Sequence, residues 1–205
     1  MRRLPGVTVL GLAYLAGSIP FSNLVARGTR GVDLREIGSG TVSATGLYRV
    51  AGFVPLAIAG SLDVAKGAVG PVLAGRDRPV LAALAGGAAV TGHDWSLFLR
   101  GAGGRGISPA MGSLVVNGWP GVAVLGAGLA GGRLARRTSL GCFLSYLALV
   151  PVLAITRGRR GALAGAAVLV PLLAKRLVGN APPPPGRSRA RALLHRLVHD
   201  QDEGP

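Results

Sequence analysis

Long apolar segments alternate with short polar loops along most of this chain. Five of these segments are nearly free of charge and lie at 4–26, 50–74, 79–98, 139–155 and 161–178. Each has about the 20 residues that an α-helix needs to cross a bilayer. A helix is expected in each, because it satisfies its own backbone hydrogen bonds inside lipid. The pattern therefore predicts an all-α fold, a polytopic membrane helical bundle.

The stretch between the third and fourth long segments leaves the number of crossings open. Residues 109–116 and 121–134 are apolar but short, and the breaker Asn-Gly-Trp-Pro separates them at 117–120. They form either one broken crossing or two, which gives six or seven in total. Seven crossings place 15 of the 23 Lys and Arg residues on one side, together with the loops 27–49 and 99–108. The positive-inside rule then favours about seven transmembrane helices, with both loops and the C-terminal tail cytoplasmic.

Composition and charge support a membrane protein. The chain has 205 residues, of which 49% are hydrophobic and 15% charged, and its net charge is +15. Because the basic residues lie at the ends of apolar segments, we expect anionic membrane lipids as their partners and no nucleic acid. The single cysteine, Cys142, excludes an intramolecular disulfide and a cysteine metal cluster.

The two ends of the chain differ in character. Residues 1–26 begin like a signal peptide, but the apolar run continues without a convincing cleavage site, so a retained first span is expected. Small polar residues and a proline interrupt that span at 17–23. Residues 1–180 are expected to form the membrane domain. Residues 181–205 are expected to form a proline-rich spacer and a basic amphipathic tail.

The tail offers a weak candidate for a metal site. His195 and His199 are four residues apart, so both would lie on one face of a helix over 187–199. Since no third ligand accompanies them, a solvated tail helix is the favoured interpretation, and no metal is expected.

The first long loop is suited to binding phosphate. It contains Gly38, Ser39, Gly40, Thr41 and Thr45, with Arg49 close behind. Glycines let successive backbone N–H groups converge on an anion, hydroxyl groups add donors, and arginine adds a planar charged fork. A plain flexible loop would also be rich in glycine and serine, so the composition alone leaves both interpretations open.

The second loop repeats this chemistry. Gly103, Gly104 and Gly106 surround Arg105 immediately before an apolar helix, an arrangement that can form an anion nest at a helix N-terminus. His93, at the end of the preceding span, could titrate near neutral pH. Because no second base accompanies it, an interfacial histidine that binds backbone is favoured over a catalytic one.

Two ionisable residues lie inside the second span. Asp63 and Lys66 are three residues apart, so they share a helical face and can neutralise each other. Ionisable residues within a span are functional candidates, and a structural pair near the interface is the equal alternative.

Five blocks occur in an order that resembles a known family. They are Gly17-Ser18-Ile19-Pro20-Phe21, Gly31-Val32-Asp33-Leu34-Arg35, Gly38-Ser39-Gly40 with Ala44-Thr45 and Arg49, Asp63-x-x-Lys66-Gly67, and Gly92-His93 with Gly103-Gly104-x-Gly106. Together they resemble the PlsY family of acyl-phosphate-dependent glycerol-3-phosphate acyltransferases, bacterial inner-membrane enzymes.

This resemblance implies a seven-helix fold with cytoplasmic motifs in the bacterial plasma membrane, and a role in phospholipid biosynthesis. It implies transfer of a fatty acyl group from acyl-phosphate to glycerol 3-phosphate, giving lysophosphatidic acid, without metal or other cofactor. It places Ser39 and Arg49 at the phosphate site, and Arg105 where the family has the second lysine of a Lys-Gly-Gly-Lys-Gly loop. The residues expected to bind substrate are Gly38, Gly40, Thr41, Thr45, His93, Gly103, Gly104 and Gly106.

The chain departs from the family pattern at several positions. Thr41 and Gly46 replace asparagines, and Ala102 replaces the first lysine of the second loop. An alternative is therefore a catalytically impaired relative that binds a phosphorylated lipid or metabolite. A small transporter is a third possibility, suggested by spans that glycine and proline interrupt.

Overall fold

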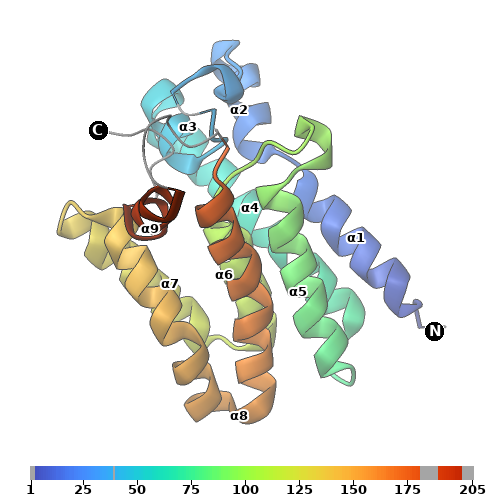
Figure 1. Cartoon of the computed structure of the whole chain (residues 1–205). Coiled ribbons are helices and arrows are strands. Elements are labelled where there is room, and N and C mark those ends of the chain that lie inside the picture. The colour runs from blue at the N-terminus through green and yellow to red at the C-terminus, as the bar shows by residue number, and fades with distance from the viewer. Residues whose placement is uncertain (1–2, 39, 181–188, 200–205) are drawn as a thin grey trace.

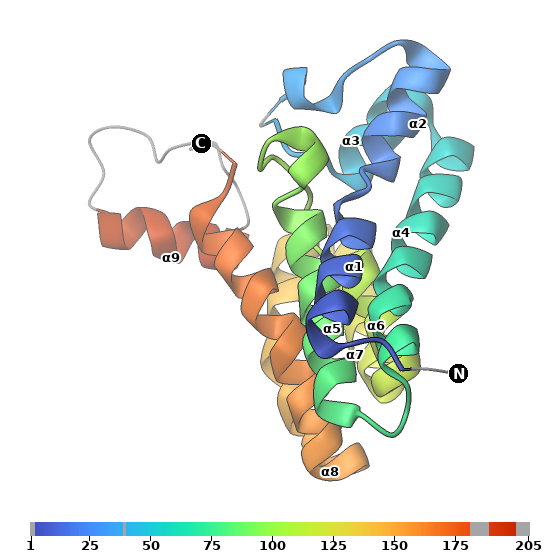
Figure 2. The ribbon, with the colours of Figure 1, turned by 90° about the vertical axis from the view of Figure 1, so that its right-hand side faces the viewer.

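The computed structural model describes residues 3–38, 40–180 and 189–199, and their regular secondary structure is helical throughout. The bundle is viewed in two directions in Figures 1 and 2. Its elements are α1 (Gly6–Ser18), α2 (Phe21–Arg30), η1 (Leu34–Glu36), α3 (Ala44–Ala51), α4 (Phe53–Ala74), α5 (Pro79–Asp94), η2 (Leu97–Leu99), α6 (Ile107–Asn117), α7 (Pro120–Leu134), α8 (Thr138–Val178) and α9 (Arg189–His199).

Three helical stretches among the described residues are long and apolar enough to cross a membrane. They are Gly6–Arg30, which comprises α1 and α2, Phe53–Ala74 and Thr138–Val178. The last has 41 residues but contains a non-helical Gly158 with φ 61° and ψ −153°. At that glycine the chain reverses, so that Gly165 lies against Leu153, and α8 consists of two antiparallel halves (Figure 1).

The stretch that left six or seven crossings open forms two separate helices. α6 ends at Asn117, and α7 begins at Pro120. Gly121 lies against Leu114 and Gly126 lies against Met111, so the two helices run antiparallel. With α1 and α2 counted as one stretch, α8 as two halves, and the short helices α3 and α9 left aside, the described residues form seven helical segments, which agrees with the larger number.

Small residues let the helices of the bundle approach closely. Gly17 of α1 lies against the backbone of Ala89 in α5, and Gly112 of α6 lies against the backbone of Val64 in α4. Without Cβ atoms at these positions the backbones can come into contact, as is usual in membrane bundles. This explains how a chain with only 4% aromatic residues packs tightly.

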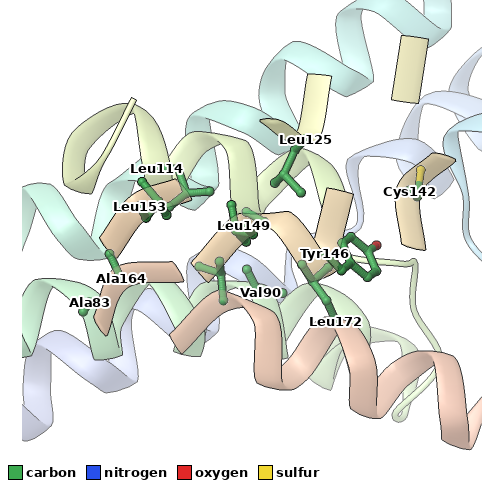
Figure 3. Packing of buried hydrophobic residues seen from close by; sticks show 12 residues of the cluster. Ala83, Val90, Leu114, Leu125, Cys142, Tyr146, Leu149, Leu153, Ala164 and Leu172 are labelled. Atoms are coloured by element: carbon green, nitrogen blue, oxygen red, sulfur yellow. The ribbon is translucent and has the colours of Figure 1, made fainter. Parts of the chain in front are cut away.

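The largest apolar cluster joins α5, α6, α7 and α8. Leu114, Leu149 and Leu153 are fully buried at its centre, and the ring of Tyr146 packs near Leu172 (Figure 3). Cys142 is buried in the same cluster. This core fixes α8 against α5, and so sets the position of the residues at the end of α8.

Several sequence-based expectations need correction. The first span is two helices that meet at Ile19–Pro20, and the loop expected over 27–49 contains η1 and α3. α9 is not simply solvated. Arg196 is buried and donates to the carbonyl of Val178, so this helix packs on the end of α8 (Figure 2).

Candidate active site

The break between α1 and α2 creates a polar surface inside the bundle. Pro20 has no N–H, and the chain at Ser18 and Ile19 leaves the helix with carbonyl groups available. The hydroxyl of Ser96 donates to the carbonyl of Ser18 at 2.5 Å, and Lys66 Nζ donates to that of Ile19 at 2.6 Å. The break therefore binds side chains from α4 and from the segment after α5.

A buried ion pair lies beneath this break. Lys66 Nζ is 2.7 Å from Asp63 Oδ1, and the two side chains are only 3% and 5% exposed. The i, i+3 spacing on α4 brings them together, as the sequence predicted. Ser22 Oγ also donates to Asp63 Oδ2 at 3.4 Å. The pair thus holds the start of α2 against α4.

His93 joins the same cluster at the end of α5. Its Nδ1 is 3.7 Å from Asp63 Oδ1, and its side chain is 13% exposed. The backbone carbonyl of His93 accepts the N–H of Gly104 at 3.2 Å. A small pocket opens beside it, lined by Phe21, Lys66 and Gly103 among others. His93 therefore lies where the buried ion pair and the second glycine-rich loop meet.

The two glycine-rich loops contact each other directly. The N–H of Val42 donates to the carbonyl of Gly103 at 3.1 Å. After that contact, Ser43 caps α3, its Oγ accepting the N–H of Gly46 at 3.1 Å. The cap fixes the direction of α3 and hence the position of Arg49 at its last turn.

The C-terminal end of α8 joins the two loops. Asn180 Nδ2 donates to Thr41 Oγ1 at 2.8 Å and to the carbonyl of Gly103 at 3.3 Å. Its Oδ1 accepts from Lys175 Nζ at 2.6 Å. Lys175 is 1% exposed and lies over the ring of Trp95, 5.1 Å from its centroid. One amide thus links three segments that are far apart in the sequence.

Lys175 and Asn180 were not singled out as site residues from the sequence. In the sequence, Lys175 is one of several basic residues near the tail, and nothing around Asn180 indicates a functional role. One signal was available, since Lys175 and Lys66 are the only lysines in a chain that otherwise uses arginine. Both lysines are buried at the same end of the bundle, where their ammonium groups are held by specific acceptors.

The structure brings Arg105, one of the two predicted arginines, into contact with this cluster. Arg105 is partly exposed, and its Nη1 donates to the carbonyl of Lys175 at 3.3 Å. Arg49 and Thr45 are exposed residues of α3, four positions apart, so they share one face. Ser39 lies outside the described residues.

The predicted glycines of the two loops have different environments. Gly38 and Gly40 adopt positive φ values of 56° and 70°. Gly103 and Gly104 are buried where the loops meet. Gly106, with φ 70°, is the N-cap that directly precedes α6, and a Cβ there would lie 2.8 Å from Asp94 Oδ1. The buried Asp94 carboxylate therefore already lies at the N-terminus of α6, where an anion nest had been predicted.

Ion pairs around Asp33, in the turn that follows α2, hold the first loop in place. Asp33 binds Arg27 Nη2 at 2.5 Å and Arg35 Nη2 at 2.7 Å. The hydrogen bond from the Arg35 side chain is the main cause that holds the pKa of Asp33 well below its usual range, against the opposing effect of burial. Asn23 Oδ1 accepts the N–H of Leu34 at 2.8 Å and ties this turn to α2.

Among the described residues, no group of three or more His, Cys, Asp or Glu side chains could hold a metal ion. The site instead gathers cationic side chains from α4, from the second glycine-rich loop and from α8, at the end of the bundle remote from the start of α1 (Figure 2). Such an arrangement can bind and neutralise phosphate groups.

Comparison with known proteins gives a consistent result. A family model described as glycerol-3-phosphate acyltransferase matches residues 7–180. A glycerol-3-phosphate acyltransferase from Synechococcus sp. (strain CC9902) is 36% identical over 173 residues, covering 83% of this chain and 86% of the relative. One from Jannaschia sp. (strain CCS1) is 37% identical over 182 residues, covering 86% and 87%.

The fold also matches a solved structure. The crystal structure of PlsY (YgiH), an integral membrane glycerol 3-phosphate acyltransferase, in its glycerol 3-phosphate form has a TM-score of 0.70 and 24% identity. The match covers 85% of this chain and 93% of that one. Its lysophosphatidic acid form gives a TM-score of 0.67 at 22% identity, with the same coverage.

Proposed function

This chain belongs to the glycerol-3-phosphate acyltransferase family, and we propose that it transfers a fatty acyl group from acyl-phosphate to glycerol 3-phosphate. It is an acyltransferase of phospholipid biosynthesis, and the product is lysophosphatidic acid. The observation that carries the proposal is the convergence of both glycine-rich loops and the end of α8 around Asn180.

The reaction needs two phosphate-bearing molecules to be held side by side. The C1 hydroxyl oxygen of glycerol 3-phosphate bonds to the acyl carbonyl carbon, and the bond from that carbon to the phosphate oxygen breaks. Inorganic phosphate leaves and takes the proton of the hydroxyl, so no further reactant is required. Positioning and charge neutralisation supply most of the rate acceleration in such a step.

Cations at this end of the bundle suit that task. We assign Ser39, Arg49 and Arg105 to the phosphate groups in the transition state. Lys175 supplies a further positive charge and is held in place by Asn180, whereas the charge of Lys66 is paired with Asp63. The loop glycines, with Thr41, Thr45 and His93, shape the binding surface.

The proposed setting is the bacterial plasma membrane, with the two loops and the C-terminal tail facing the cytoplasm. The excess of basic residues at this end of the bundle supports that orientation. It would expose the site to a water-soluble acceptor and leave the acyl chain of the donor in the bilayer.

An assay with purified full-length protein in detergent tests the proposal. Acyl-phosphate and glycerol 3-phosphate should give lysophosphatidic acid and inorganic phosphate in equal amounts. Asn180→Ala should lower the rate, while Asn180→Asp keeps the acceptor for Lys175 and isolates the loss of the two donated bonds. Absence of product above a heat-denatured control would refute the proposal. Thermal stabilisation by glycerol 3-phosphate without product would instead favour the impaired relative.

A further inference from the structure

A second pocket lies at the opposite end of the bundle. It has a volume of about 430 Å³ and is enclosed by the turn from α4 to α5, the turn from α6 to α7, and the bend in α8. This volume falls within the range of about 300–1000 Å³ that is typical of ligand sites. Because the glycine-rich loops are at the other end, the pocket takes no part in the proposed acyl transfer.

Three arginines line this pocket. One comes from the turn between α4 and α5, and two come from the bend of α8. They are Arg76, Arg157 and Arg160, and all three are exposed. Within the described part of the chain, no ion pair includes any of them. The nearby carboxylate in sequence, Asp77, pairs with Arg3 instead.

Arg78, two residues after Arg76, has a structural role that the three pocket arginines lack. Arg78 donates to the carbonyls of Leu73 and Ala74, the last turn of α4, and to that of Leu4. It therefore caps α4 and ties the turn to the N-terminal segment. Arg76, Arg157 and Arg160 make no such contact among the described residues, although the fold brings them to one pocket.

The location of these charges is unusual for a membrane protein. Basic residues are normally concentrated in the short loops on the cytoplasmic side of the membrane. The orientation that places most basic residues and the acyl-transfer site on that side leaves this pocket, with its three arginines, on the other side. Three like charges around one pocket also repel one another, and a bound anion would remove that repulsion. The guanidinium fork matches the geometry of phosphate oxygens.

The flank of the pocket is apolar and faces outward. Val115 and Trp119 line it and are 58% and 62% exposed. Tryptophan is enriched at the headgroup level of bilayers, where its ring contacts both lipid and water. A ligand that joins a phosphate to acyl chains would satisfy both parts of the pocket. A free phosphate would use only the arginines.

We propose that this pocket binds the phosphate group of an anionic phospholipid in the leaflet opposite the acyl-transfer site. The arginines would contact the headgroup, and the first part of an acyl chain would lie along Val115 and Trp119. The proposal is independent of the reaction at the other end.

Fluorescence of Trp119 provides a local test. The chain has two tryptophans, so Trp95→Phe leaves Trp119 as the only one. In detergent micelles, brominated phosphatidylglycerol should quench Trp119 at lower mole fractions than brominated phosphatidylcholine. Arg157→Gln with Arg160→Gln should weaken the apparent affinity about tenfold or more, because two charge-assisted contacts are lost.

Arg159→Gln is the matched control, since Arg159 is an exposed arginine of the same bend that does not line the pocket. It should leave quenching unchanged, and acyl transfer in the double variant and in the control should report an intact fold. Equal quenching by the two lipids, or the same loss in the control, would overturn the site. Displacement of the lipid by low millimolar inorganic phosphate would overturn the lipid assignment and make free phosphate the ligand.

Discussion

Breaking the buried pair of Asp63 and Lys66 should destabilise the bundle more than removing it. At the 2.7 Å separation, an effective dielectric constant of about 20 gives a gross attraction of roughly 6 kcal/mol. Loss of one partner from a buried pair usually costs about 3–5 kcal/mol, because the other charge stays buried. We therefore expect Asp63→Asn to lower the free energy of unfolding by about 3 kcal/mol.

The double variant separates the attraction between the two charges from the free-energy cost of burying them. With Lys66→Met added, neither charge needs to be desolvated, so the combined loss should be below about 2 kcal/mol. Reversible unfolding in mixed micelles, followed by tryptophan fluorescence, measures the free energy of unfolding of Asp63→Asn, of Lys66→Met alone and of the double variant. Losses that simply add, or a loss below about 1 kcal/mol for Asp63→Asn, would refute the reasoning. Either result would mean that each charge is satisfied without the other, Asp63 by the hydroxyl of Ser22 and Lys66 by the carbonyl of Ile19.

Three further predictions concern the loops. Arg49→Ala should reduce acyl transfer about 100-fold, and because Arg49 is exposed, the stability of the protein should change little. The control is Arg30→Ala. Arg30 is also exposed, and its replacement should change the rate less than about twofold. Gly106→Ala should destabilise the fold strongly, since its Cβ would lie 2.7 Å from Val90 Cγ1. Gly101→Ala, with φ 87° and open space, should cost only about 1–2 kcal/mol in thermal unfolding. The lowered pKa of Asp33 stabilises the loop above the unfolded-state value of about 3.9, so amide protection at Leu34–Glu36 should decrease as pH falls below that value. Asp33→Asn should abolish this dependence, and an unchanged pH profile in that variant would contradict the assignment.

Apolar segment length and charge distribution were sufficient to predict a helical membrane bundle with the two loops at one end. Helix ends were harder to predict, since α3 forms inside a stretch that glycine and serine made look like a loop. Its helix depends on the Ser43 cap and on Leu47, which is buried among residues of distant segments. Hydropathy cannot report such tertiary contacts.

The site was predicted in part. The pairing of Asp63 with Lys66 follows from helical spacing, which is a local property. The contact of Asn180 with Thr41 spans 139 residues and depends on how α8 packs against α5. Nothing in the sequence around Asn180 indicates that its amide would reach the first loop.

That contact also bears on the departures from the family pattern. The resemblance calls for an asparagine at 41, where this chain has threonine, and a lysine at 102, where it has alanine. The amide of Asn180 donates to the hydroxyl of Thr41, so an amide is still present beside the first loop, contributed by the end of α8. Lys175 lies over Trp95, near the segment in which Ser96 N–H donates to the carbonyl of Ala102. A positive charge is therefore also present beside the second loop. If these groups serve in place of the missing ones, Thr41→Val should weaken acyl transfer by removing the bond that joins Asn180 to the Thr41 hydroxyl, and Thr41→Asn should retain it. Equal activity in Thr41→Val and the parent would show that the contact has no role in catalysis.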